Sequence, residues 1–203
     1  DQVFGGLMGD ALGTIDLSDP TTLHFLNVEN FVTAATSDRL IVSAPGVAGV
    51  TDSRNILWIT GAALGSSAAL GHVDFADPAT WSAVGYLSIE TNKLFHEVRT
   101  GEVFAAVAGG ETVYLFVQLG IETSPLALVP QTSDWKIAYA GEIILPPAGA
   151  MSDIRTIDMA NGLSNYLLAN VNALSEMAGT GGSIIINGDL NGDFIEFADL
   201  FNW

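Results

Sequence analysis

Short apolar runs separated by glycine, proline, asparagine and aspartate fill most of the 203-residue chain. The clearest series lies between residues 85 and 120, where apolar and polar side chains alternate and turn residues recur about every eight to ten positions. This pattern predicts four strands joined by tight turns, at residues 85–90, 93–99, 102–108 and 112–120. The last strand is apolar on both faces, so we expect it to lie centrally in its sheet.

Further strands are predicted on both sides of this series. Their apolar runs are bounded by turn residues and lie at 14–17, 23–28, 39–44, 56–62, 135–145 and 183–186. Residues 73–81 are predicted to form a loop. So many short strands with glycine-rich and proline-rich turns indicate a mainly β chain. We expect an antiparallel β-sandwich of jelly-roll or immunoglobulin-like topology.

The apolar spacing changes after Pro147, where helical spacing replaces strict alternation. The positions concerned are Leu163, Leu167, Val171, Leu174 and Ala178, and glycines follow them at 179, 181 and 182. Helical spacing that ends in glycine predicts one helix at about 163–178.

The chain is expected to have three parts. Residues 1–20 are rich in glycine and form an extended amino-terminal arm. Residues 21–186 form the β-sandwich body with its helix, and residues 187–203 form a separate carboxyl-terminal segment. We find no internal sequence repeat that covers the body.

Hydrophobic residues make up 49% of the chain and charged residues 14%, a balance that provides a buried core and excludes a disordered chain. The net charge of −17 excludes nucleic acid and anionic membrane surfaces as partners, because such a surface repels phosphates. Residues 56–73 carry no formal charge, but their glycines and serines make them too weakly apolar for a membrane-spanning helix. We therefore expect no membrane span.

The chain has no cysteine, which excludes disulfides, thiolate nucleophiles and cysteine-based zinc sites. A secreted protein without disulfides needs another stabilising device, and bound calcium is a common one. The first residue is Asp1 rather than Met, which a removed signal peptide would explain. These features favour an extracellular or cell-surface location.

The segment 187–203, NGDLNGDFIEFADLFNW, holds the one motif whose spacing implies a specific chemistry. Asp189, Asn191 and Asp193 alternate, and Asp199 supplies a later carboxylate. A tight loop can turn such oxygen side chains toward one hard cation, so these four residues are the predicted calcium ligands. The alternative is an acidic Asn-Gly turn before a short helix, with no metal.

This segment resembles the calcium loop of dockerin type I repeats, a relative of the EF-hand that reads DxNGDGxVxxxDL. Residues 189–193 match the opening of that pattern, Ile195 matches its apolar position, and Asp199 with Leu200 match its end. The glycine expected after residue 193 is absent, which makes the loop one residue shorter. The resemblance implies a single calcium loop followed by a short helix, similar to carboxyl-terminal modules of secreted, surface-associated bacterial proteins.

No catalytic signature stands out. The sequence contains no GxSxG, HExxH, P-loop or GxGxxG motif, and its histidines lie in unrelated contexts (His24, His72 and His96). Glu90, Glu97 and Glu102 fall on neighbouring predicted strands. A glycosidase pair is one interpretation of these residues, and solvated charges on an outer sheet face are another. We predict that the chain is not an enzyme.

Together these features predict an extracellular structural or adhesive protein that assembles with copies of itself, as a homo-oligomer or polymer, and gains stability from calcium. A fibre, a surface layer and a virion shell are all compatible with this prediction. The alternative is a carbohydrate-binding or carbohydrate-active module of a secreted polysaccharide system, with a glycan stacked on Trp58, Trp81 or Trp135. Burial in the sandwich core is the other explanation of these tryptophans.

Overall fold

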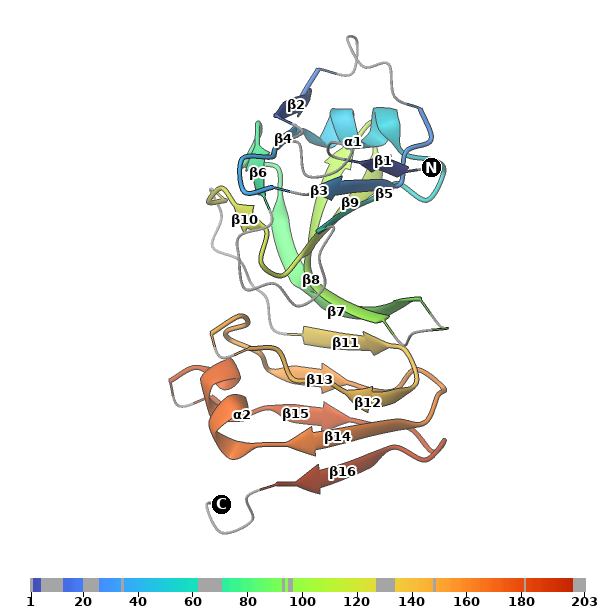
Figure 1. Ribbon diagram of the computed structural model, residues 1–203, viewed down its shortest axis with the longest axis vertical. Coiled ribbons are helices and arrows are strands. Elements are labelled where there is room, and N and C mark those ends of the chain that lie inside the picture. Colours follow the sequence, from blue (N-terminus) through green and yellow to red (C-terminus); the bar gives the residue numbers. More distant parts are fainter. Residues whose placement is uncertain are drawn as a thin grey trace. The chain divides into compact units, whose positions relative to one another are not determined.

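Figure 1 shows the computed structural model, which describes residues 2–4, 13–19, 26–33, 35–61, 71–92, 94, 97–126, 134–147, 149–180 and 182–198. The chain is mainly β, as predicted, and the described residues include two α-helices. It divides into two compact units. Unit 1 is Asp1–Val84 with Glu102–Gln131, and unit 2 is Gly85–Gly101 with Thr132–Trp203.

Unit 1 winds as a series of stacked turns, each of which places one strand in each of two parallel sheets. The first sheet contains β1 (Gln2–Phe4), β3 (Asn30–Thr33), β5 (Ile56–Gly61) and β9 (Glu111–Gln118). The second contains β2 (Thr14–Leu17), β4 (Arg39–Val42), β6 (His72–Phe75) and β10 (Glu122–Thr123). We call one full turn a rung. Gln2 pairs with Asn30 and Asn30 pairs with Trp58, so these two successive rungs have the same length.

The predicted antiparallel sandwich is wrong for these strands, and a jelly-roll or immunoglobulin-like topology is not confirmed. The strand pairs between successive rungs are parallel in both sheets of unit 1. Alternation within a strand shows that one face is buried, but it does not show which distant strand is the partner. Parallel partners need a long connection, and here that connection is the rest of the rung.

The series predicted between residues 85 and 120 does form strands that are neighbours in chain order, but the described residues form three strands and not four. The predicted strands 93–99 and 102–108 belong to one strand, which runs through the turn expected between them. β7 (Ser82–Asn92), β8 (Glu97–Ala108) and β9 are neighbours in chain order. Gly109 and Gly110 join β8 to β9 with φ angles of 60° and 89°, the left-handed values that a two-residue hairpin turn requires. β9 lies between β5 and β8, and its Val113, Leu115 and Phe116 are fully buried, so its predicted central position is also confirmed.

A helix that the sequence pattern did not predict covers part of the core of unit 1. α1 (Ala44–Val50) begins after Ser43, whose side-chain oxygen accepts a hydrogen bond of 3.0 Å from the backbone N–H of Gly46. Proline fits the first turn of a helix, so the Pro45-Gly46 pair starts a helix here and does not merely end the predicted 39–44 strand. The buried side of α1 comprises Ala44, Gly46, Val47 and Val50.

Unit 2 has the same rung architecture. Its first sheet contains the part of β7 after residue 84, β11 (Asp134–Ala138), β13 (Thr156–Asp158) and β15 (Ile185–Asn187), all paired in parallel. Its second sheet contains β12 (Gly141–Ile143), β14 (Asn165–Ala169) and β16 (Phe194–Phe197), also parallel. The three rungs are therefore β11–β12, β13–β14 and β15–β16, and α2 (Val171–Ala178) lies between the second and the third along the chain.

The predicted helix at 163–178 is wrong in its first half. Residues 165–169 form strand β14, in which Asn165, Leu167 and Ala169 are buried and Leu168 is exposed. A spacing of four residues keeps side chains on one face of a strand as well as of a helix, so the leucines alone do not separate the two. The helix begins only after Asn170, whose Oδ1 accepts hydrogen bonds from the backbone N–H groups of residues 172 and 173.

Other predicted boundaries also change. Strand 14–17 is confirmed as β2, but β6 occupies the start of the predicted 73–81 loop. The predicted 135–145 strand is two strands, β11 and β12. Residues 26–28 are not a strand, and residues 23–25 of that prediction lie outside the described part.

Residues 194–197, predicted to begin a short helix, are strand β16. Among the described residues, no helix is long and apolar enough to cross a membrane.

Candidate functional site

The acidic motif forms the turn between β15 and β16. Asp189 accepts hydrogen bonds from the backbone N–H of Asn191 at 2.8 Å and from that of Gly162, on the preceding rung, at 2.6 Å. Asp193 accepts from the backbone N–H of Asp189 at 2.7 Å and from that of Asn165 at 3.0 Å. Each carboxylate therefore closes the turn and also ties it to the rung before it.

Asn165 is the buried centre of this contact. Its side-chain nitrogen lies 3.1–3.2 Å from four oxygens, namely Asp193 Oδ1, Asn161 Oδ1 and the carbonyl oxygens of Met159 and Leu163. The side-chain oxygen of Asn165 is the one buried side-chain polar atom without a hydrogen-bond partner in the described part of the chain. With these contacts, the buried side-chain amide of Asn165 holds the turn at residues 189–193 against the preceding rung.

A similar turn occurs one rung earlier. Tyr166 pairs with Phe194, so Asn161 and Asp189 occupy equivalent places in successive rungs. Asn161 Oδ1 accepts from the backbone N–H of Leu163 at 2.8 Å, as Asp189 Oδ1 does from residue 191. This repeat was not predicted. Its signal in the sequence is faint, because polar residues at 161 and 165 before an aromatic residue have the same spacing as those at 189 and 193.

The structure brings together two of the four predicted calcium ligands. Asp189 and Asp193 share the turn, and Asn191 contributes its backbone N–H to it, whereas Asp199 lies outside the described residues. Within the described ranges, no group of three or more His, Asp and Glu side chains is placed to hold a metal ion. Asp193 Oδ1 accepts two N–H groups of Asn165, but the other three carboxylate oxygens accept one N–H each and keep a second lone pair. Those three oxygens still fit a hard cation as a partial ligand set.

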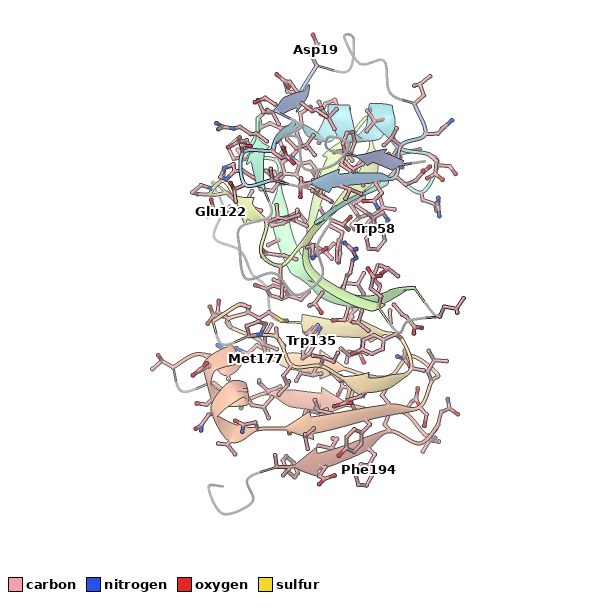
Figure 2. The ribbon with its side chains drawn as sticks, viewed as in Figure 1. Asp19, Trp58, Glu122, Trp135, Met177 and Phe194 are labelled. Atoms are coloured by element: carbon pink, nitrogen blue, oxygen red, sulfur yellow. The ribbon has the colours of Figure 1, made fainter. Side chains whose placement is uncertain are left out.

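An aromatic pair lies on the outer face of the sheet formed by β12, β14 and β16. The rings of Tyr166 and Phe194 stack with centroids 5.5 Å apart and an interplanar angle of 8°. The Tyr166 hydroxyl donates to Glu196, and this bond raises the pKa of the tyrosine. Phe194 is 56% exposed, and Figure 2 marks it on the last rung of unit 2. This face combines apolar rings with a carboxylate.

A row of charged side chains crosses the second sheet of unit 1. Arg39, His72 and Glu122 are neighbours on β4, β6 and β10. His72 lies 3.1 Å from Asp74 and 3.4 Å from Glu122. Arg39 also donates to Asp74 and lowers the pKa of that carboxyl. Among the described residues, these contacts join acidic to basic side chains and include no serine or threonine nucleophile, so the row is an ion-pair network. The other two histidines, His24 and His96, lie outside the described residues.

The three candidate glutamates lie in different settings. Glu97 accepts hydrogen bonds from Arg99 Nε at 3.0 Å and Nη2 at 2.7 Å. Burial raises the pKa of Glu102 to about 7. Glu90 lies on β7. A glycosidase needs two carboxyl groups that face one bond, whereas the Glu97 carboxylate is held by Arg99.

The candidate tryptophans are mostly buried. Trp81 and Trp135 have no exposed surface, and their indole N–H groups donate to Asp77 at 3.0 Å and to Ser88 at 2.9 Å. Trp58 is half-buried, with its ring 4.7 Å from that of Phe116. Trp81 and Trp135 therefore cannot stack on a glycan, as the core interpretation predicted.

Comparison with protein-family models, curated proteins and solved structures finds no match for this chain. Its function therefore has to be inferred from its own residues.

Proposed function

We propose that the chain is an extracellular or cell-surface structural or adhesive protein that assembles with copies of itself, with calcium adding to its stability. The observation that supports this proposal is the stacked-rung architecture. A rung is held by backbone hydrogen bonds to the rung on each side, so a rung at the end of a stack offers the same bonds to another chain.

The acidic turn supports the calcium part of the proposal. Asp189 and Asp193 lie in contact through the backbone N–H of residue 189, in a chain with a net charge of −17. A divalent cation held by these carboxylates, by the Asn191 side chain and by Asp199 reduces their mutual repulsion. It thereby stabilises the junction between the last two rungs.

The experiment compares thermal unfolding of the parent, Asp189→Ala and Asp193→Ala in chelator and in millimolar calcium. Both variants are expected to be less stable in chelator, because each loses an acceptor of backbone N–H groups. The test of calcium binding is therefore the rise in melting midpoint of each protein between chelator and calcium. The parent midpoint should rise with calcium and the variant midpoints should not. A parent whose midpoint is the same in both solutions would remove calcium from the proposal.

The assembly part is tested on the native chain by negative-stain microscopy and analytical ultracentrifugation over a range of concentrations. Oligomers or filaments that grow with concentration are expected. A chain that stays monomeric at high concentration in millimolar calcium would overturn the structural function.

A carbohydrate-binding module is the second candidate. The stacked, partly exposed Tyr166 and Phe194 rings beside Glu196 favour it. Glycan sites combine aromatic surfaces with groups that accept hydrogen bonds from the sugar hydroxyls. Binding to a panel of insoluble glycans, lost in Phe194→Ala or Trp58→Ala but kept in Trp81→Phe, would support this alternative.

A further inference from the structure

Unit 2 contains three Asn-Gly pairs, a dipeptide that is prone to spontaneous deamidation in water. They are Asn161-Gly162, Asn187-Gly188 and Asn191-Gly192. In this reaction the backbone nitrogen of the glycine attacks the side-chain carbonyl carbon of the asparagine. Glycine favours the attack because no Cβ atom hinders the approach. The dipeptide is the same at all three places, so the fold decides which asparagine reacts.

The reaction needs only water as a co-reactant. A bond forms between the glycine nitrogen and Cγ, and the bond between Cγ and Nδ2 breaks. The side-chain nitrogen leaves as ammonia, and the proton that it gains balances the one that the glycine nitrogen loses. One water molecule then opens the resulting succinimide ring. Opening at one carbonyl gives aspartate, and opening at the other gives isoaspartate, in which the main chain runs through the former side chain.

At the first pair, both reacting groups are held by hydrogen bonds. The side-chain nitrogen of Asn161 donates to two carbonyl oxygens of the preceding rung, at 2.9 and 3.0 Å. Its side-chain oxygen accepts two further hydrogen bonds, at 2.8 and 3.2 Å. The backbone N–H of Gly162 donates to Asp189 Oδ2 at 2.6 Å. The carbon to be attacked and the nitrogen that would attack it are therefore both fixed.

At the second pair, the peptide group between the two residues is held. Asn187 ends strand β15, and its carbonyl oxygen accepts a hydrogen bond of 2.8 Å from the backbone N–H of Met159. The nitrogen of Gly188 belongs to the same peptide group. It can reach the Asn187 side chain only if that group turns and gives up its hydrogen bond to the neighbouring rung.

The third pair has none of these restraints. Asn191 and Gly192 are exposed in the turn between β15 and β16. Within the described residues, the Asn191 side chain, its carbonyl oxygen and the N–H of Gly192 make no hydrogen bond. The backbone N–H of Asn191 donates to Asp189 at 2.8 Å, but this group takes no part in the reaction.

We propose that Asn191 is a site of spontaneous deamidation, and that the fold directs the reaction to it in preference to Asn161 and Asn187. The inference goes beyond the proposed function and does not depend on it. The product carries a carboxylate between Asp189 and Asp193, so the turn gains a negative charge in a chain whose net charge is already −17. In the isoaspartate form the main chain of the turn is also longer.

Peptide mapping by mass spectrometry measures the three rates in one sample. The full chain is incubated in mildly alkaline buffer with a chelator, so that no bound cation holds the Asn191 side chain. Chymotrypsin then cuts after Leu163 and Leu190, which places the three asparagines on different peptides. In the folded chain, Asn191 is expected to react at least about tenfold faster than either of the others, because each hydrogen bond that must break first raises their barrier.

The same incubation in urea is the control. An unfolded chain holds none of the three pairs in place, so the three rates should converge. Asn191→Gln is the matched variant, because its side chain is one methylene longer and closes the ring more slowly. In this variant Asn161 and Asn187 should react as they do in the parent.

Equal rates at the three sites of the folded chain would overturn the inference, as would a faster reaction at Asn161 or Asn187. The same holds if Asn191 stays intact in the folded chain while the sample in urea reacts. A difference that persists in urea would assign the selectivity to the local sequence and exclude the role of the fold. None of these results bears on calcium binding or self-assembly, which melting midpoints and sedimentation test separately.

Discussion

Among the residues that the structure describes, Glu102 is the one whose pKa departs most clearly from that of a surface side chain. It lies on β8, and burial raises its pKa from 4.5 to about 7. A carboxyl group in that setting holds its proton at a pH where a solvated glutamate has lost it. One interpretation of the sequence placed Glu102 on an outer sheet face, and alternation alone could not predict that the fold would partly cover it.

The pH dependence of stability follows from this shift. Below pH 4.5 both the folded and the unfolded chain carry a proton on residue 102, so it has no effect. As pH rises to about 7 the unfolded state loses the proton first, and stability falls by up to roughly 3 kcal/mol. Glu102→Gln should therefore match the parent near pH 4.5 and exceed it in free energy of unfolding at pH 8.

Urea unfolding at both pH values measures the difference. Glu176→Gln on the exposed side of α2 is the control, because it makes the same change of charge at a solvated position. An equal effect of the two substitutions at pH 8 would contradict the raised pKa of Glu102.

At the scale of elements, α1 depends on a close contact between its backbone and that of β2. A Cβ atom on Gly46 would lie 1.6 Å from the carbonyl oxygen of Leu17, and Leu17 is fully buried. Only glycine allows the helix to approach the strand at this distance. The sequence shows a Pro-Gly pair, which suggested a turn. It could not show why the glycine is needed, because the contact that requires it is with β2, which lies far from it along the chain.

Gly46→Ala is expected to destabilise unit 1 by about 3 kcal/mol, although alanine is the better helix former. The cost arises because the methyl group pushes α1 away from Leu17. Ala48→Gly, on the half-buried side of the same helix, should cost only about 1 kcal/mol. Chemical denaturation of both variants gives the two values, and a Gly46→Ala variant at least as stable as the parent would exclude the close contact.

At the scale of the whole molecule, charge opposes both folding and assembly. Asp and Glu number 23 against six Lys and Arg, so repulsion acts within one molecule and between copies. Added salt should therefore raise the melting midpoint, by about 2–4 °C for each kcal/mol of repulsion that it screens.

Differential scanning calorimetry from low to moderate sodium chloride measures this rise. Choline chloride is the control, because it screens charge without offering a small cation to the carboxylates. A midpoint that rises with sodium but not with choline would indicate cation binding and contradict screening as the cause.

The sequence by itself determined that the chain is mainly β, that Gly109 and Gly110 form a hairpin turn, and that β9 lies centrally in its sheet. These properties depend on residues that are close together along the chain. It also identified Asp189, Asn191 and Asp193 as one turn, because the turn is local.

Only the tertiary structure decided that the strands stack in parallel rungs, that residues 165–169 extend as a strand, and that Asn165 ties two turns together. Partners in successive rungs are separated by a whole rung of chain. The backbone hydrogen bonds between them do not depend on which side chains the residues carry, so the sequence does not show the pairing. The lower burial of Ile186 than of its partner Ile157 was likewise hidden, because a half-buried isoleucine and a fully buried one are the same letter in the sequence.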